Sequence, residues 1–179
     1  MQEIEVKILE IDREVIQKKL TEFGARLVFD GLMHAIYYDS ADRSLKKHGD
    51  TLRLRREGSE SVLAFKRHIS DDRAKVREEK EVGVSDFDAM ASVLTGLGFS
   101  AWLEMRKHRT SYLLDGLHFE LDKYHGAYDY IPEFLEIEGS DIATIHHYAG
   151  LLGYSKEDCR PWDAVQLAAY YAGAGSPPA

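Results

Sequence analysis

Charged side chains recur at every second position in most of the strand-like segments of this chain. The pattern is clearest at residues 3–8, where Glu3, Glu5 and Lys7 alternate with isoleucine and valine. Side chains at positions i and i+2 of a β-strand lie on the same face, so these three charges share one face. Arginine suits the recognition of phosphate, and carboxylates suit the ligation of hard cations. The spacing returns in Arg53 and Arg55, Lys66 and His68, Lys75 to Glu81, Lys107 and Arg109, Glu120 and Asp122, and Glu136 and Glu138.

The composition favours a small charged ligand over a nucleic acid or a membrane. The net charge is −8, which argues against binding to a nucleic-acid duplex, because that affinity comes largely from clustered lysine and arginine. Basic residues that recur on the predicted strand faces of an acidic protein instead favour a small, multiply charged anion. No apolar stretch approaches the roughly 20 residues that a membrane-spanning helix needs.

Length and cysteine content predict one intracellular domain. The chain has 179 residues, of which 44% are hydrophobic, and it contains one cysteine. We therefore expect a single domain over residues 1–172, with a disordered tail at 173–179. The N-terminus lacks a basic-then-apolar signal segment, so we expect a cytoplasmic location.

Hydrophobic periodicity predicts an α+β protein in which helices accompany many antiparallel strands. Asp12 and Ser85 are the expected caps of the first two helices, Asp115-Gly116 is typical of a hairpin, and a turn or bulge is expected near Asp30-Gly31. The predicted helices cover 12–23, 85–97, 141–152 and 162–172. The predicted strands cover 3–8, 26–39, 51–57, 61–68, 75–84, 101–114, 117–124 and 133–139.

The strands admit two architectures. A weak internal repeat relates the two halves of the chain, since each begins with a Glu-x-Glu strand followed by a helix and an aromatic strand. One architecture is an open sheet with its charged face in water, which needs no function. The other is a closed barrel with a charged lumen, covered outside by the helices. Such a lumen must be wet or hold metal and anion, because unpaired buried charges are very costly.

Taken together, the charged pairs resemble the CYTH family, also called the triphosphate tunnel metalloenzymes. The likeness extends over about residues 1–155 and follows the order of the family's motifs. That family includes class IV adenylate cyclases, thiamine triphosphatases and inorganic triphosphatases. The resemblance implies an eight-stranded antiparallel barrel, a tunnel that takes up a triphosphate together with Mg²⁺ or Mn²⁺.

The resemblance also implies roles for individual residues. Those expected to hold phosphate oxygens are Lys7, Arg53, Arg55, Lys66, Arg77, Lys107 and Arg109. Those expected to bind metal are Glu3, Glu5, Asp122, Glu136 and Glu138, with Glu120 as a further candidate. Catalytic roles fall on Glu5, Lys7, Glu79 and Glu81.

Three functions are open at this point. The favoured one is metal-dependent hydrolysis of a triphosphate that releases orthophosphate, because it needs no dedicated adenine pocket. The alternative is cyclisation of ATP to cyclic AMP and pyrophosphate, which would use the same anion cradle. A module that binds polyphosphate or a nucleotide without turnover is the third. A homodimer is expected if apolar outer strand faces are left uncovered.

Overall fold

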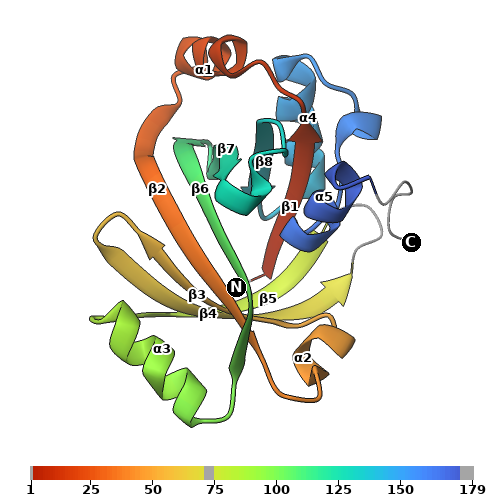
Figure 1. Cartoon of the computed structure of the whole chain (residues 1–179). Helices are drawn as coiled ribbons and strands as arrows, with labels where there is room; N and C mark the ends of the chain where they lie inside the picture. The colour runs from red at the N-terminus through yellow and green to blue at the C-terminus, as the bar shows by residue number, and fades with distance from the viewer. Residues whose placement is uncertain (1, 71–74, 174–179) are drawn as a thin grey trace.

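The computed structural model describes residues 2–70 and 75–173, without the side chains of residues 2, 3, 70 and 75. Eight antiparallel strands form a closed barrel in the order β1-β5-β4-β3-β2-β6-β7-β8 (Figure 1). The expected barrel is therefore confirmed, and the open sheet is excluded. The strands are β1 (Gln2–Leu9), β2 (Arg26–Asp39), β3 (Thr51–Glu57), β4 (Glu60–Ser70), β5 (Lys75–Gly83), β6 (Ser100–Leu114), β7 (Leu117–His125) and β8 (Phe134–Gly139).

Strand register brings the charged residues of neighbouring strands side by side. Lys7 on β1 lies opposite Glu136 on β8, and Lys66 on β4 lies opposite Glu79 on β5. Because one face of every strand points inward in a closed barrel, the period-2 charges gather in the lumen. The intervening apolar residues face outward.

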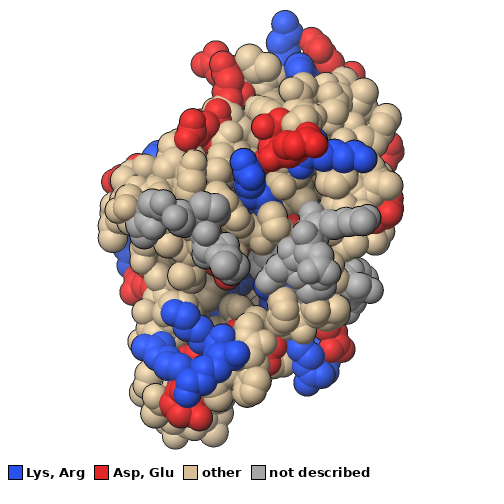
Figure 2. All heavy atoms as spheres, turned by 90° about the vertical axis from the view of Figure 1, so that its right-hand side faces the viewer, with Lys and Arg blue, Asp and Glu red and all other residues tan. Residues whose placement is uncertain are grey.

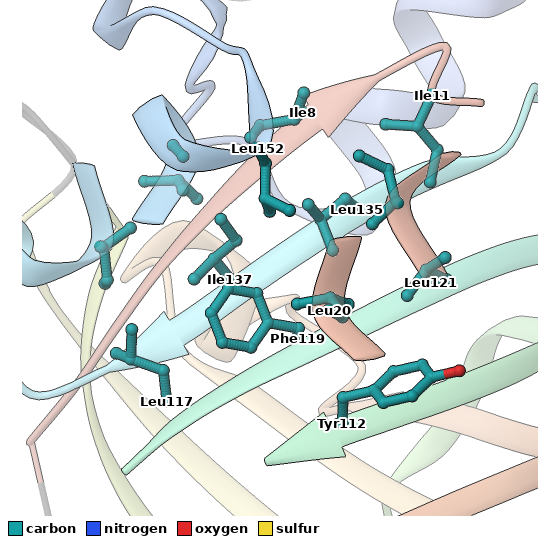
Figure 3. Close-up of a cluster of buried hydrophobic side chains, with 14 of the residues drawn as sticks. Ile8, Ile11, Leu20, Tyr112, Leu117, Phe119, Leu121, Leu135, Ile137 and Leu152 are labelled. Atoms are coloured by element: carbon teal, nitrogen blue, oxygen red, sulfur yellow. The ribbon is translucent and has the colours of Figure 1, made fainter. Parts of the chain in front are cut away.

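Three helices cover the outside of the barrel. They are α1 (Arg13–Glu22), α3 (Phe87–Gly96) and α4 (Ile142–Leu152), and each begins after an aspartate whose side chain accepts a backbone N–H. The largest core cluster lies between α1, α4 and the outer faces of β1, β7 and β8, as Figure 3 shows. Leu20, Phe119 and Ile137 are fully buried there. This packing anchors the strands that carry much of the charged lumen.

A helix near the C-terminus packs differently from these three. Helix α5 (Ala164–Tyr171) lies at one end of the barrel, where Leu167 and Ala168 share a buried cluster with Met105, Tyr124 and Phe134. Those three residues lie on the same strand faces as the lumen charges. The segment before α5 is held to β1 by reciprocal backbone hydrogen bonds of 2.8 Å between Lys7 and Arg160.

Several local predictions are wrong in detail. The irregularities of β2 lie between Leu27 and Phe29 and at Tyr37–Tyr38, not at Asp30-Gly31, where the pairing with β6 is regular. Asp86 caps α3 in place of Ser85, because its side chain accepts the hydrogen bond from Ala89 N–H. A short helix, α2 (Ser44–Lys47), was not expected in the polar segment after β2.

The hairpin predicted at Asp115-Gly116 is confirmed, because Leu114 on β6 pairs with Leu117 on β7. Asp115 and Gly116 both have positive φ, as a tight hairpin turn of this sequence requires. The predicted tail at 173–179 lies outside the described residues except for Gly173. No helix in the described part of the chain has the length and apolar character needed to span a bilayer.

Candidate functional site

Two cavities lie within the barrel and meet at a shared set of charged residues. The first, of about 310 Å³, opens beside α5, and the second, of about 440 Å³, opens at the other end. The walls of both include Arg53, Arg55, Lys66, Arg109 and Glu138. The shared residues make the lumen a tunnel with a charged middle section.

Lys7 is held between carboxylates on two strands. Its Nζ lies 2.7 Å from Glu136 Oε2 and 3.3 Å from Glu5 Oε1, and all three residues are buried. Burial disfavours the ammonium, but the charges of Glu136 and Glu5 outweigh it and raise the pKa of Lys7. Lys7 is therefore a permanent cation in the tunnel wall.

Arg109 and Lys107 both engage Asp122. Arg109 donates from Nε to Asp122 Oδ1 at 2.8 Å and from Nη2 to Oδ2 at 2.7 Å, and Lys107 Nζ donates to Oδ2 at 2.5 Å. Burial opposes ionisation of Asp122, but these two cations outweigh it and lower its pKa. Arg109 also pairs with Glu120. Asp122 thus fixes the direction of two basic side chains.

Arg53 and Arg55 are held less directly. Arg53 Nη2 lies 3.9 Å from the nearest oxygens of Glu79 and Glu81, and Arg55 Nη2 lies 3.6 Å from Glu81. Their Nε atoms are buried and make no hydrogen bond among the described residues, although Arg55 Nε lies 3.6 Å from Glu57 Oε2 in an ion pair. Lys66 makes a tighter contact, 2.7 Å from Nζ to Glu79 Oε2. Two buried guanidinium groups therefore line the tunnel beside a lysine.

The pKa of Glu81 is raised in the Glu79–Glu81 pair. Burial, a hydrogen bond with Glu79 and the charge of Glu79 raise the pKa of Glu81, and the nearby arginines only partly oppose this. Two carboxyl groups that share a hydrogen bond hold one proton more readily than separate groups do. This pair lines the cavity at the end away from α5.

Two groups of carboxylates are close enough to hold a cation. Glu5, Glu136 and Glu138 form one, and Glu120, Asp122 and Glu136 form the other, with one oxygen from each member lying within 4.8 Å of the others. All three members of the first group line the α5-side cavity, whereas Asp122 lines neither cavity. The oxygen-only donor set fits a hard divalent cation. The first group fits it better, because each of its three carboxylates lines the cavity and Asp122 of the second group does not.

Two of the predicted site residues remain, Arg77 and Glu3. Arg77 is buried and donates to its neighbour's backbone at Val76 O, and it lines neither cavity. Glu3 on β1 lies opposite Arg77 on β5, but the side chain of Glu3 is outside the described part of the chain. Figure 2 shows basic side chains gathered in a group at the lower left of one face of the molecule and in a smaller one at the lower right, each beside acidic side chains.

Sequence reasoning missed the uncharged part of the tunnel wall. Tyr37, Trp102, Met105 and Tyr124 line the α5-side cavity. The period-2 charge pattern could not find them. The alternation of Met33, Ala35 and Tyr37 on one face of β2 was the available signal.

The closed antiparallel barrel forms a tunnel whose wall is lined by lysine, arginine and glutamate side chains. The family model described as "CYTH domain" matches residues 1–158, and the chain belongs to that family. The resemblance inferred from the charged pairs is thereby confirmed.

The descriptions of individual relatives mention two activities, adenylate cyclase and triphosphatase. A Methanocaldococcus jannaschii protein named "Putative adenylate cyclase" is 28% identical over 140 residues, 78% of each chain. The structure of the PH1012 protein from Pyrococcus horikoshii is 25% identical with a TM-score of 0.77, covering 92% of this chain and 98% of that one. A Hippeastrum protein, described as a "Putative adenylyl cyclase" with a dominant triphosphatase activity, has a TM-score of 0.60 over 96% of each chain. At 19% identity, that likeness concerns the fold alone.

Proposed function

We propose that this protein is an enzyme that hydrolyses a triphosphate inside its tunnel, with a divalent cation, and releases orthophosphate. One observation carries the proposal. Arg53, whose buried Nε makes no hydrogen bond among the described residues, lines a lumen whose wall also holds Arg55 and the Glu5–Glu136–Glu138 carboxylate group. A buried donor without a partner points to an ion or water that belongs there. Donors beside clustered carboxylates suit an anion that binds with a cation.

The basic residues would bind the phosphate oxygens and stabilise their charge. Lys7, Arg53, Arg55, Lys66, Lys107 and Arg109 all line the α5-side cavity. Donors that are fixed before the substrate arrives stabilise developing charge without reorganising, which is the main protein contribution to phosphoryl transfer. Asp122 would act as a positioning residue, since it orients Lys107 and Arg109.

The first carboxylate group would hold the cation. We assign Glu5, Glu136 and Glu138 to it, and Mg²⁺ or Mn²⁺ fits their oxygen donors. When bound, such a cation would neutralise phosphate charge and favour a nucleophilic water. Lys7, between Glu5 and Glu136, would keep these carboxylates apart and in place.

The Glu79–Glu81 pair would move the proton. A general base works best when its pKa is closer to neutrality than that of an ordinary carboxylate, and the pKa of Glu81 is raised. In hydrolysis the water oxygen bonds to the terminal phosphorus, the bridging P–O bond breaks, and the water proton passes to Glu81. The products are orthophosphate and the shortened phosphate chain.

Cyclisation of ATP is the second candidate, and the name of the archaeal relative favours it. It would use the same cradle, but the ribose hydroxyl would attack the α-phosphorus and pyrophosphate would leave. The Hippeastrum protein, described with a dominant triphosphatase activity, shares the fold and is an example of hydrolysis on it.

Product analysis separates the candidates. ATP labelled at the γ-position is incubated with the protein and Mg²⁺ or Mn²⁺, and the products are resolved by chromatography. Hydrolysis predicts labelled orthophosphate with ADP. Labelled pyrophosphate with cyclic AMP would establish the cyclase. ATP binding without either set of products would favour the module that binds a nucleotide without turnover.

A further inference from the structure

Lys46 differs from the other lysines in the wall of the α5-side cavity. Four lysines line that cavity, and Lys46, on the short helix α2, is the one that lies outside the barrel strands. The Nζ atoms of the other three, Lys7, Lys66 and Lys107, lie 2.7, 2.7 and 2.5 Å from a carboxylate oxygen. Lys46 forms no ion pair with any described residue. Its positive charge is therefore available to an anion in the cavity.

The side chain of Lys46 lies against the indole of Trp102. Lys46 Nζ is 5.1 Å from the centre of the Trp102 ring, and Arg43 Cζ, from the same segment, is 5.5 Å from it. Trp102 lines the cavity together with Tyr37 and Tyr124, and we call this α5-side end of the tunnel the aromatic mouth. The face of an aromatic ring attracts an ammonium group. The indole therefore helps to hold a flexible side chain at the aromatic mouth.

The buried carboxylate of Asp39 fixes the backbone of Lys46. Asp39 Oδ2 accepts a hydrogen bond from Lys46 N–H at 3.0 Å. Asp39 Oδ1 accepts from Leu45 N–H at 3.1 Å and from Ser40 N–H at 2.8 Å. Hydrogen bonds to an ionised acceptor are stronger than those between neutral groups. One carboxylate at the end of β2 therefore sets the position of the turn that carries Lys46.

A second aspartate fixes the other end of the same connection. Asp50 Oδ1 accepts a hydrogen bond of 3.0 Å from His68 N–H on β4. The connection between β2 and β3 is thus attached to the barrel on both sides of Lys46. A binding group that is already in place loses less conformational freedom when its ligand arrives.

We propose that Lys46 is a further binding residue for the substrate, which contacts the phosphate group nearest the aromatic mouth, and that Asp39 is its positioning residue. The inference rests on the proposed function for the identity of the substrate, but the contact itself needs no turnover. Lys46 is exposed, and a charge at the rim of a site acts chiefly on ligand capture and on its dependence on salt. Lys46 would therefore lower KM and leave the chemical step unchanged.

The test measures phosphate release from inorganic triphosphate by wild type, Lys46→Met, Lys46→Arg and Lys47→Met. Lys46→Met should raise KM about three- to tenfold and keep kcat within about twofold of wild type. The rise should shrink at high salt, which screens an exposed charge, and Lys46→Arg should restore most of the lost affinity. Lys47 is exposed on α2 and lines neither cavity, so Lys47→Met is the control and should match wild type. An unchanged KM in Lys46→Met, or an equal rise in Lys47→Met, would overturn the contact.

A double-mutant cycle tests the positioning role of Asp39. In Asp39→Asn the side-chain nitrogen cannot accept a hydrogen bond, so the N–H groups of α2 lose part of their acceptor. If Asp39 acts through Lys46, Asp39→Asn should raise KM in the wild-type background and add little in the Lys46→Met background. Independent, additive effects of the two substitutions would overturn the positioning role.

Calorimetry separates failure of the contact from failure of the proposed hydrolysis. Binding of inorganic triphosphate in EDTA needs no turnover, and Lys46→Met should weaken it whereas Lys47→Met should not. If wild type released no orthophosphate while this selective weakening was found, the proposed hydrolysis would fail and the contact would stand. Release by wild type with the same Kd in Lys46→Met would overturn the contact and leave the hydrolysis in place.

Discussion

Lys7 Nζ lies 2.7 Å from Glu136 Oε2 across the pair formed by the first and last strands of the barrel. The contact therefore lies at the seam that closes the barrel and inside the candidate metal and phosphate site. The same residues would serve the stability of the fold and its chemistry. Substitutions at these residues should therefore change both the stability of the protein and its activity.

Removing the ammonium at the seam should destabilise the metal-free protein. Lys7→Met leaves Glu5 and Glu136 buried without their shared cation, and breaking a buried pair in this way costs about 3–5 kcal/mol. Urea unfolding in EDTA measures the change. Lys18→Met is the control, because Lys18 is exposed and 3.9 Å from Glu22, and its effect should stay within about 0.5 kcal/mol. Equal effects of the two variants would contradict the prediction.

Neutralising a proposed metal ligand should weaken metal-dependent stabilisation. A cation that binds only the folded state raises its melting temperature in proportion to its affinity. Glu138→Gln removes one charge from the Glu5–Glu136–Glu138 group, so the rise in Tm with added Mn²⁺ should shrink. The exposed Glu14 on α1 supplies the control Glu14→Gln, which should keep the full rise. A full rise in Glu138→Gln would remove Glu138 from the metal site.

Arg53 and Arg56 lie three positions apart on β3 and face opposite sides of the barrel wall. Arg53 lines the tunnel, whereas Arg56 lies outside, 3.6 Å from Asp88. Loss of a charged hydrogen bond to phosphate costs about 1.5–3 kcal/mol, so Arg53→Gln should lower kcat/KM about 10- to 100-fold. Arg56→Gln should remain within about twofold of wild type. Steady-state phosphate release compares them, and similar losses in both variants would argue against a phosphate contact by Arg53.

Glu81 should limit stability at neutral pH. Its pKa is raised by burial and by Glu79, so its favourable contribution to stability is present below the ordinary pKa of a glutamate and is lost as pH rises through the raised pKa of the folded state. Glu81→Gln removes the ionised group and should be more stable than wild type at pH 7.5, with a smaller difference at pH 4. Urea unfolding in EDTA at both pH values is the measurement. Glu22→Gln, on the exposed end of α1, should show no such pH-dependent gain.

The same variant also tests the proposed proton transfer. If Glu81 accepts the water proton, Glu81→Gln should lower kcat more than it changes KM, and the acidic limb of the pH–rate profile should be lost. An unchanged profile with reduced stability would leave Glu81 with a structural role.

Much of the fold was predictable because strand periodicity reports which face is buried. The alternation of Glu3, Glu5 and Lys7 with apolar residues indicates two distinct faces, and eight such segments can close a barrel. Periodicity alone does not say whether the charged face meets water or a lumen. The resemblance to a family decided between them, and strand pairing confirms it.

The aromatic mouth was not predictable for a physical reason. Trp102 departs from the alternation of β6 because a bulge inserts it, and bulges arise from pairing that a single strand does not reveal. The placement of α5 over the tunnel depends on packing between residues far apart in the chain, since Leu167 and Phe134 belong to one buried cluster. Its helical pattern predicts a helix but not the surface that it covers.

The central claim is metal-dependent hydrolysis at the carboxylate and arginine lining of the tunnel. The most direct measurement is orthophosphate release from inorganic triphosphate, ATP and thiamine triphosphate by wild type and Glu5→Gln, with Mg²⁺, Mn²⁺ or EDTA. The account predicts release by wild type with at least one of the metals, none in EDTA, and a fall of at least about 100-fold in Glu5→Gln. Absence of orthophosphate from every substrate, or release that is unaffected by EDTA and by Glu5→Gln, would contradict it.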